Sequence, residues 1–215
     1  VKKLVNVPIK YYLTINMGGV EKVVDDVGGV DVNVPFSYYD SHSNNKHFVK
    51  GKMHLNGEWA LAYARMRHED PQGDYGRQKR QQQFIKAILK KAVSFDSLSH
   101  FTKLLNTVSS NIQTNLTFND MQSIFLNYRS AAKNVSTGTL QGQSAGVYSS
   151  LYGTYLDYQI PSTDEMQKVS DELRAALGLK SETINNENVK ENAANSGFSW
   201  TSTTDQTYTI YNPDL

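Results

Sequence analysis

The spacing of hydrophobic and polar residues along the N-terminal part of the chain predicts alternating strands and helices. Residues 11–17 (YYLTINM) are rich in aromatic and β-branched side chains, as strands are. Residues 18–27 carry four valines at helical spacing, and Gly28-Gly29 ends this helix. Residues 30–35 (VDVNVP) alternate strictly, which predicts a second strand. A strand, a helix and a strand in this order predict the crossover unit of an α/β sheet.

Further helices are predicted from apolar stripes and from capping residues. Asn56 is a natural N-cap for a helix in residues 56–67, but Tyr63, Arg65 and Arg67 then alternate with small or apolar residues, which predicts that the helix runs into a strand. The other predicted helices cover the Phe84–Ala92 stripe, residues 95–111, residues 117–133 with Thr117 and Asp120 at capping offsets, and residues 162–178 with a Ser162/Glu165 capping box. Tyrosine-rich strands are predicted within residues 137–160.

Two segments predict little regular structure. Residues 37–47 (SYYDSHSNNKH) are predicted to form a flexible polar loop. Because of this flexibility, His42 and His47 in the loop are not predicted to bind metal. From Lys180 the composition shifts to Asn, Ser, Thr and Glu. We therefore predict one domain over residues 1–178, followed by a polar, flexible tail over residues 179–215.

Composition excludes several classes of protein. Hydrophobic residues make up 39% of the 215 residues, enough for a packed core. The net charge of +1 argues against a broad nucleic-acid footprint. The absence of cysteine excludes disulfides and thiolate metal sites. No apolar run is long enough to span a membrane. The opening residues VKKLVNVP predict the end of a helix, so we expect the chain to be a fragment that lacks an N-terminal part.

The most informative stretch is residues 65–81, RMRHEDPQGDYGRQKRQ, in which arginines bracket a tight loop. Guanidinium groups bind phosphate oxygens bidentately and remain charged at every relevant pH. Arg65 and Arg67 are expected on one face of a strand end. Asp74 is expected to cap the next helix, which places Arg77 in its first turn and Gln81 one turn further on. A helix N-terminus also favours anions, so the pattern predicts a diphosphate site.

The same residues also allow a simpler interpretation. Residues 65–80 hold five basic and three acidic residues, which could pair with one another on the surface. Lys79 is then only a solvated charge. Arg80 lies off the line of Arg77 and Gln81, so it could be a phosphate ligand or a surface residue. Spacing alone leaves both interpretations open.

A resemblance bears on this choice. The segment VEKVVDDVGGVDVNVPF, followed by KGKMHLNGEWALAYARMRHEDPQGDYGRQKRQQQFIKAILKKA, resembles the LytR-CpsA-Psr family in order and in spacing. The likeness covers residues 1–178 and implies the α/β/α sandwich of that family, truncated at its N-terminus. It implies pyrophosphate binding by Arg65, Arg67, Arg77, Arg80 and Gln81, and catalytic roles for Arg65, Arg67 and Asp74.

The resemblance also implies what the whole protein does. Family members move glycopolymers such as wall teichoic acid or capsule from a polyprenyl-diphosphate carrier to peptidoglycan, with Mg²⁺. They work outside the cytoplasmic membrane of mainly Gram-positive bacteria and are held there by an N-terminal anchor. The anchor and the Mg²⁺-binding carboxylates are expected in the missing N-terminal part, so no metal ligand is predicted here and catalysis by this segment alone is expected to be weak.

Two other functions stay open at this stage. A non-catalytic protein that binds polyprenyl phosphates would not need the metal ligands. A transcriptional regulator would need a DNA-binding motif, and neither a helix-turn-helix nor a basic face is evident. For a lipid-binding function, an apolar cavity is expected beside Arg77, lined by the helix that carries Phe84 and Ile88 and by the helices in residues 97–133.

Overall fold

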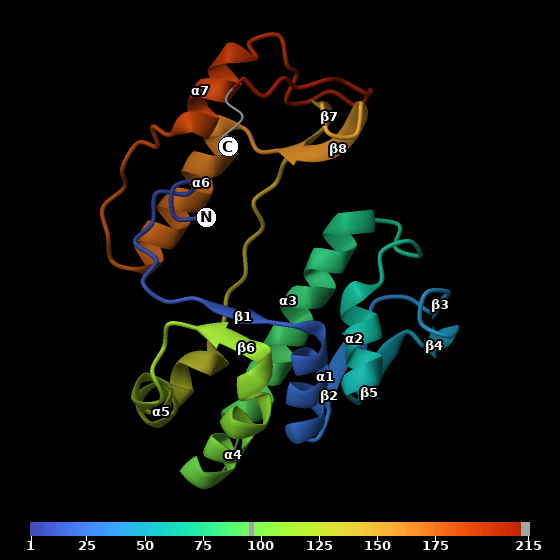
Figure 1. Cartoon of the computed structure of the whole chain (residues 1–215), viewed down its shortest axis with the longest axis vertical. Helices are drawn as coiled ribbons and strands as arrows, with labels where there is room; N and C mark the ends of the chain where they lie inside the picture. Colours follow the sequence, from blue (N-terminus) through green and yellow to red (C-terminus); the bar gives the residue numbers. More distant parts are fainter. Residues whose placement is uncertain (95–96, 212–215) are drawn as a thin grey trace. The chain divides into compact units, whose positions relative to one another are not determined.

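The computed structural model describes residues 1–94 and 97–211 of the chain. It groups them into two compact units, residues 11–137 and residues 1–10 with 138–215. Helices and strands occur in both units, which confirms the predicted α/β class (Figure 1). No described helix combines the length and the apolar character needed to cross a membrane.

The unit of residues 11–137 contains three two-stranded antiparallel sheets. They pair β1 (Leu13–Ile15) with β6 (Ile112–Thr114), β2 (Val30–Val34) with β5 (Gly51–Leu55), and β3 (Tyr38–Asp40) with β4 (Lys46–Phe48). The crossover predicted from residues 11–35 is therefore wrong for the described residues, since β1 and β2 pair with different strands. The predicted polar loop at 37–47 is also wrong, because it contains most of the β3–β4 hairpin.

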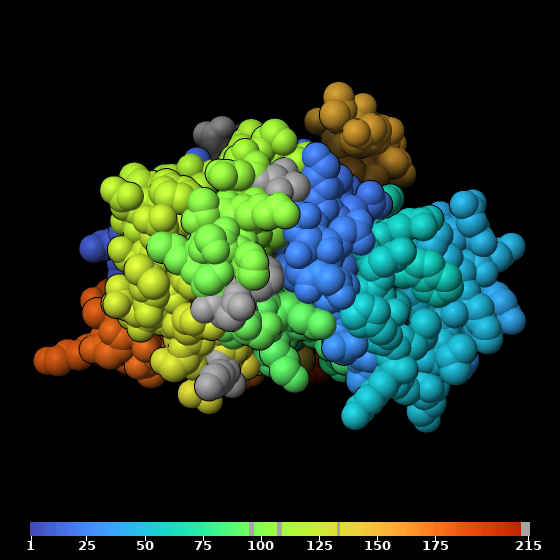
Figure 2. Space-filling view, turned by 90° about the horizontal axis from the view of Figure 1, so that it is seen from below, coloured from blue at the N-terminus to red at the C-terminus, as the bar shows by residue number. Residues whose placement is uncertain are grey.

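Helices pack around these strands in the order that the sequence predicted. They are α1 (Met17–Asp26), α2 (Gly57–Arg65), α3 (Gly73–Ala92), α4 (Leu98–Val108) and α5 (Phe118–Asn127), with 3₁₀ turns at Ser109–Asn111 and Arg129–Lys133. Asn56 caps α2 as predicted, by accepting from the Trp59 N–H at 3.1 Å. Thr117 and Asp120 form a complete capping box. Figure 2 shows α1, in blue, between α4 in green and α2 in cyan.

The core of this unit lies between α1, α2, α3 and the β2–β5 pair. In β2 the residues alternate between buried valines and exposed Asp31 and Asn33, as the pattern predicted. The largest side chains with almost no exposed surface are Tyr63 of α2, Phe48 of β4 and Leu55 of β5. Gly28 and Gly29 both adopt positive φ, 75° and 81°, which L side chains avoid. They reverse the chain so that β2 follows α1 directly.

The second unit contains the hairpin of β7 (Gln143–Ser149) and β8 (Thr154–Ile160), followed by α6 (Thr163–Ala176) and α7 (Glu187–Ala194). Ser162 caps α6, accepting from the Glu165 N–H at 3.1 Å. The Glu165 carboxylate lies 3.3 Å from Lys168 in an ion pair. Within the described part of the chain it does not bond back to the Ser162 N–H, so the predicted capping box is incomplete.

The segment after residue 178, predicted to be a tail without structure, contains α7 and supplies part of this unit's core. Phe198 and Tyr208 are buried with Ala145 and Val147 of β7, and Thr207 forms a bridge with Gly146. Arg174 of α6 donates to the Lys180 carbonyl at 2.6 Å. The sequence signal was weak because these aromatic residues are isolated among polar ones. The boundary at residue 178 therefore differs from the grouping in the structure.

This packing predicts that Phe198→Ala destabilises the unit by about 3 kcal/mol, because the Phe198 ring packs edge-on against Trp200 and Tyr208. Urea unfolding followed by tryptophan fluorescence measures the effect. Tyr211→Ala is the matched control, since Tyr211 is an exposed aromatic residue of the same segment. Equal unfolding midpoints for the two variants would show that residues 198–211 do not stabilise the fold.

Candidate functional site

The arginine-rich loop connects the end of α2 to the start of α3. Arg65 is the last residue of α2, and Met66 leaves the helix with φ −51° and ψ 134°. The strand predicted around Arg65 and Arg67 is therefore wrong. Ala60, Tyr63 and Ala64 are buried on one face at helical spacing, and the cap at Asn56 starts a helix that alanines favour. Arg67 follows the helix in the loop and is exposed.

Asp74 is the point at which two of the predicted arginines meet. Its Oδ1 forms an ion pair with the Arg77 guanidinium and lies 3.9 Å from Nε of Arg67. Its Oδ2 accepts a hydrogen bond from Gln78 at 3.1 Å. Arg67 approaches from the loop and Arg77 from the first turns of α3. The structure thus brings these two guanidinium groups to one carboxylate, and both remain partly exposed.

Asp74 does not cap α3, contrary to the prediction. The N-cap position is Gln72, whose side chain makes no capping hydrogen bond. Asp74 lies in the first turn of the helix. Gln72 therefore gives the first turn no side-chain cap, and a helix N-terminus of this kind favours a nearby anion.

Arg65 and Gln81 do not join Arg67 and Arg77 at the Asp74 carboxylate. The Gln81 amide donates to the Ala64 carbonyl at 3.3 Å, which holds α3 against the end of α2. The Arg65 side chain makes no hydrogen bond or ion pair with the residues that the structure describes, and it lines a separate cavity of about 190 Å³ that also includes His42 and Lys46. Arg65 is therefore exposed but is not joined to the Asp74 carboxylate.

Arg80 is buried, and the prediction that it could bind pyrophosphate is not supported. Its side chain is 2% exposed. Its Nε donates to the Tyr63 carbonyl at 3.1 Å, and its other two nitrogens contact the Asp70 carboxylate and the Met66 carbonyl. These acceptors are protein groups at the end of α2 and in the loop. Arg80 thus joins α2, the loop and α3.

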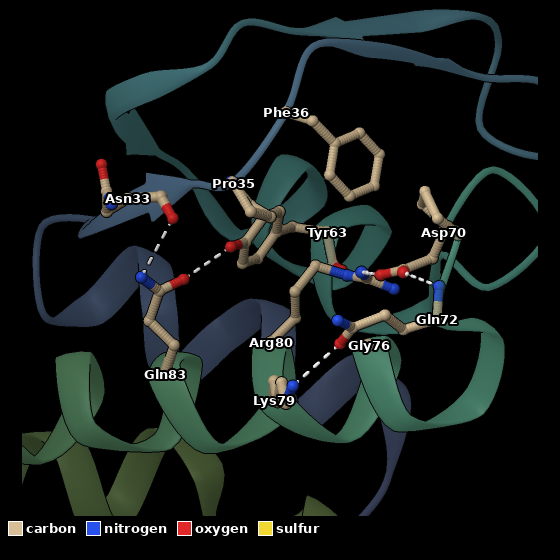
Figure 3. Close-up of a pocket in the computed structure, with 11 residues that line it drawn as sticks. Asn33, Pro35, Phe36, Tyr63, Asp70, Gln72, Gly76, Lys79, Arg80 and Gln83 are labelled. Atoms are coloured by element: carbon tan, nitrogen blue, oxygen red, sulfur yellow. Dashed lines mark hydrogen bonds and ion pairs between the residues drawn. The ribbon is translucent and has the colours of Figure 1, made fainter.

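A cavity of about 430 Å³ lies beside this buried pair (Figure 3). Apolar surface comes from Pro35, Phe36 and Tyr63, and polar groups come from the loop and from one side of α3; the lining is Asn33, Pro35, Phe36, Tyr63, Asp70, Pro71, Gln72, Gly76, Lys79, Arg80 and Gln83. The predicted lining by Phe84 and Ile88 is wrong for this cavity, since both pack into the core cluster instead. Lys79 lines the cavity and donates to Gln72 at 2.8 Å, so it is not merely solvated.

Tyr63 connects the cavity to the core. Its hydroxyl donates to Gln83 at 2.5 Å, and the Gln83 amide donates to the Asn33 carbonyl at 3.1 Å (Figure 3). Burial raises the pKa of Tyr63 to about 12, so the hydroxyl stays protonated at neutral pH and remains a donor. The chain Tyr63–Gln83–Asn33 links α2, α3 and β2.

The sequence did not reveal Asp70 as a structural residue. Its Oδ1 accepts from the Gln72 N–H at 2.7 Å, and its other oxygen pairs with Arg80. Gly76 makes this possible, because a Cβ at that position would overlap the Asp70 carboxylate. The only available signal was Asp70-Pro71 before a helix, which is typical of turns in general.

The motif around these residues is shared with known proteins. A sequence model of the LytR_cpsA_psr family (LytR-CpsA-Psr) matches residues 1–175. The chain belongs to this family. It is 39% identical over 180 residues to a polyisoprenyl-teichoic acid–peptidoglycan teichoic acid transferase, TagU, of Enterococcus faecalis. That alignment covers 84% of this chain and 56% of TagU, so the chain spans little more than half the length of that relative.

Solved structures confirm the fold of the family. A protein of Enterococcus faecalis described as a transcriptional regulator superposes with a TM-score of 0.77 and 36% identity, covering 94% of this chain and 72% of that one. TagV of B. subtilis superposes with a TM-score of 0.69 and 32% identity, covering 83% and 68%. The mixed α/β architecture is therefore the architecture of LytR-CpsA-Psr proteins.

The residues near the arginines do not form a Mg²⁺ site. Magnesium requires several oxygen ligands in near-octahedral geometry. Asp74 is paired with two arginines and Gln78, and Asp70 is paired with Arg80. Neither carboxylate is therefore available to a metal in this arrangement.

The Asp70–Arg80 pair predicts a large effect of Gly76→Ala. The added methyl group would displace the Asp70 carboxylate and leave Arg80 buried without its partner, which costs about 3 to 5 kcal/mol. Thermal or urea unfolding measures the loss. Gly18→Ala is the matched control, because it also lies near the start of a helix and its Cβ would approach no atom closer than 3.7 Å. An unchanged stability of Gly76→Ala would mean that the pair does not hold the loop.

Proposed function

We propose that this chain is the diphosphate-binding part of a glycopolymer transferase that acts in the cell envelope. The observation that carries the proposal is the convergence of Arg67 and Arg77 on Asp74 at the uncapped N-terminus of α3. Two guanidinium groups around one carboxylate leave a net positive charge, and ion pairs this exposed are weak enough for a phosphate to compete.

In this proposal each residue has a distinct role. Arg67 and Arg77 bind the oxygens of a polyprenyl diphosphate, while Asp74 holds both guanidinium groups in position. Arg65, whose side chain is unpaired in the described structure, neutralises further charge. Gln81 keeps α3 in register with α2 through the Ala64 carbonyl. Arg80 acts only by positioning, since its nitrogens are bound to protein acceptors.

The reaction class follows from the relatives. The similar TagU is named as a transferase of teichoic acid to peptidoglycan. Transfer breaks the P–O bond between the glycopolymer-bearing phosphorus and the bridging oxygen of the carrier diphosphate. An acceptor hydroxyl loses its proton and forms the new phosphodiester, and the bridging oxygen leaves with the polyprenyl monophosphate. Arginines that stabilise the leaving phosphate contribute to such a step by neutralising charge. We propose that this chain binds the donor for that reaction outside the cytoplasmic membrane.

Several finer points belong to the same proposal. The donor is carried on a polyprenyl lipid, and the Mg²⁺ that the resemblance implies would be held by carboxylates other than Asp70 and Asp74. The cavity beside Phe36 and Tyr63 offers apolar surface next to the loop, which suits the first isoprene units of the lipid. A membrane anchor remains a prediction from the resemblance.

The proposal predicts that Arg77→Lys weakens binding of farnesyl diphosphate by roughly 10- to 150-fold, since each charge-assisted hydrogen bond contributes about 1.5 to 3 kcal/mol. Lysine keeps the charge but loses the planar pair of donors. Isothermal titration of detergent-solubilised farnesyl diphosphate measures the change, and inorganic diphosphate in a parallel titration separates the contribution of the headgroup.

The control is Lys90→Arg, an exchange of the same two residue types at an exposed position near the end of α3. It should bind like the original chain. If Arg77→Lys and Lys90→Arg bind farnesyl diphosphate equally well, the arginines of the loop only pair on the surface and the proposed site is wrong. Binding of DNA that weakens steeply as the salt concentration rises would instead favour a transcriptional regulator.

A further inference from the structure

A second cluster of polar side chains joins the β3–β4 hairpin to the arginine loop. Asp40 ends β3, His42 follows it in the hairpin, and Glu69 belongs to the loop between α2 and α3. One ligand atom from each of these residues lies within 4.8 Å of the other two. The three residues come from segments about 30 positions apart in the sequence, so only folding brings them together.

The cluster lacks the cations that normally neutralise buried carboxylates. Asp40 is 2% exposed. Within residues 1–94 and 97–211, no lysine or arginine forms an ion pair with Asp40 or Glu69. Lys46, the nearby lysine, is instead paired with Glu58 at 2.7 Å. Buried carboxylates are usually paired or bind metal ions, so this arrangement calls for a cation.

An independent observation concerns Glu69. Its Oε2 is shielded from solvent and has no hydrogen-bond partner among the described residues. Its other oxygen, Oε1, accepts hydrogen bonds from the Ser41 hydroxyl at 2.7 Å and from the Ser41 backbone N–H at 3.2 Å. Ser41 therefore holds one oxygen of Glu69, while the other oxygen lacks a partner among the described residues.

The surrounding contacts orient the three ligands. The Ser41 hydroxyl donates to Oε1 of Glu69 at 2.7 Å and lies 3.1 Å from Nδ1 of His42. The His42 ring stacks on His68, with ring centroids 4.8 Å apart. Oδ1 of Asp40 accepts a hydrogen bond from the backbone N–H of His42 at 3.1 Å. Such outer contacts are typical of metal ligands, whose orientation they fix.

We propose that Asp40, His42 and Glu69 bind a divalent transition-metal ion of the zinc or manganese class. One imidazole and two carboxylates suit these ions, whereas Mg²⁺ and Ca²⁺ prefer ligand sets made only of oxygen. Ligand atoms on one ion lie within about 4.4 Å of one another, since each bond is about 2.2 Å long. A small movement of the exposed His42 ring therefore suffices.

The site would connect the β3–β4 hairpin to the arginine loop. Glu69 lies two residues after Arg67 and one before Asp70, so an ion bound there would restrain the segment that presents Arg67. The inference is independent of the proposed diphosphate site, because its ligands and its readout are different. The sequence predicts a flexible polar loop around His42, whereas in the structure the pairing of β3 with β4 positions this residue.

Titration of the metal-stripped chain with ZnCl₂ and, separately, MnCl₂ tests the proposal by calorimetry. We expect one strong site, weakened at least about 10-fold in His42→Ala and in Glu69→Gln, because even an outer partner of a metal ligand contributes that much. His47→Ala is the matched control, since His47 lies in the same hairpin, stacked on Tyr39 away from the cluster. It should bind like the original chain.

Thermal unfolding provides a second readout that separates binding from misfolding. Without metal, the melting temperatures of His42→Ala and His47→Ala should be similar, since both residues are exposed. Zinc should raise the melting temperature of the original chain and of His47→Ala, but not that of His42→Ala. The proposal is overturned if neither ion binds, or if His42→Ala and Glu69→Gln bind zinc as tightly as His47→Ala does.

Discussion

The buried ion pair of Arg80 with Asp70 is the interaction on which the geometry of the site depends. The last carbonyls of a helix lack partners within the helix, and Arg80 donates to two of them, Tyr63 and Met66, where α2 ends. Both charges are out of contact with water, so losing either partner would leave the other unsatisfied. Gly76 leaves room for the pair. These contacts hold the end of α2 and the start of α3 together and thereby restrain the loop between them.

This fixed frame separates two kinds of charge within one short loop. Arg80 and Asp70 face inward and serve the fold. Arg67, Arg77 and Asp74 keep part of their side chains exposed, and in the proposed function an anion competes with Asp74 for the guanidinium groups. A site that binds and releases a charged ligand requires this combination, because the groups must be positioned before the ligand arrives without being permanently neutralised.

The loop also contacts the β3–β4 hairpin. Glu69 contacts the β3–β4 hairpin, where Ser41 donates to one of its oxygens and where Asp40 and His42 each place a ligand atom within 4.8 Å of a Glu69 oxygen. The loop is thus tied to α3 on one side and to the hairpin on the other. Within the unit of residues 1–10 and 138–215, the segment after residue 178 completes the packing of the β7–β8 hairpin with only a few aromatic side chains.

The sequence by itself determined the family and several of the helices and strands. Short-range signals sufficed for α1, β2 and α3 and for the caps at Asn56 and Thr117, because periodicity and capping depend on neighbours within a few residues. The motif also singled out Arg67, Arg77 and Asp74, which the structure brings together. The capping role predicted for Asp74 is wrong. Only the tertiary structure decided which strands pair, that Arg65 ends a helix and not a strand, that Arg80 is buried, and that Asp40 and His42 meet Glu69. Those outcomes depend on contacts between segments far apart in the chain, where burial and pairing outweigh local preference.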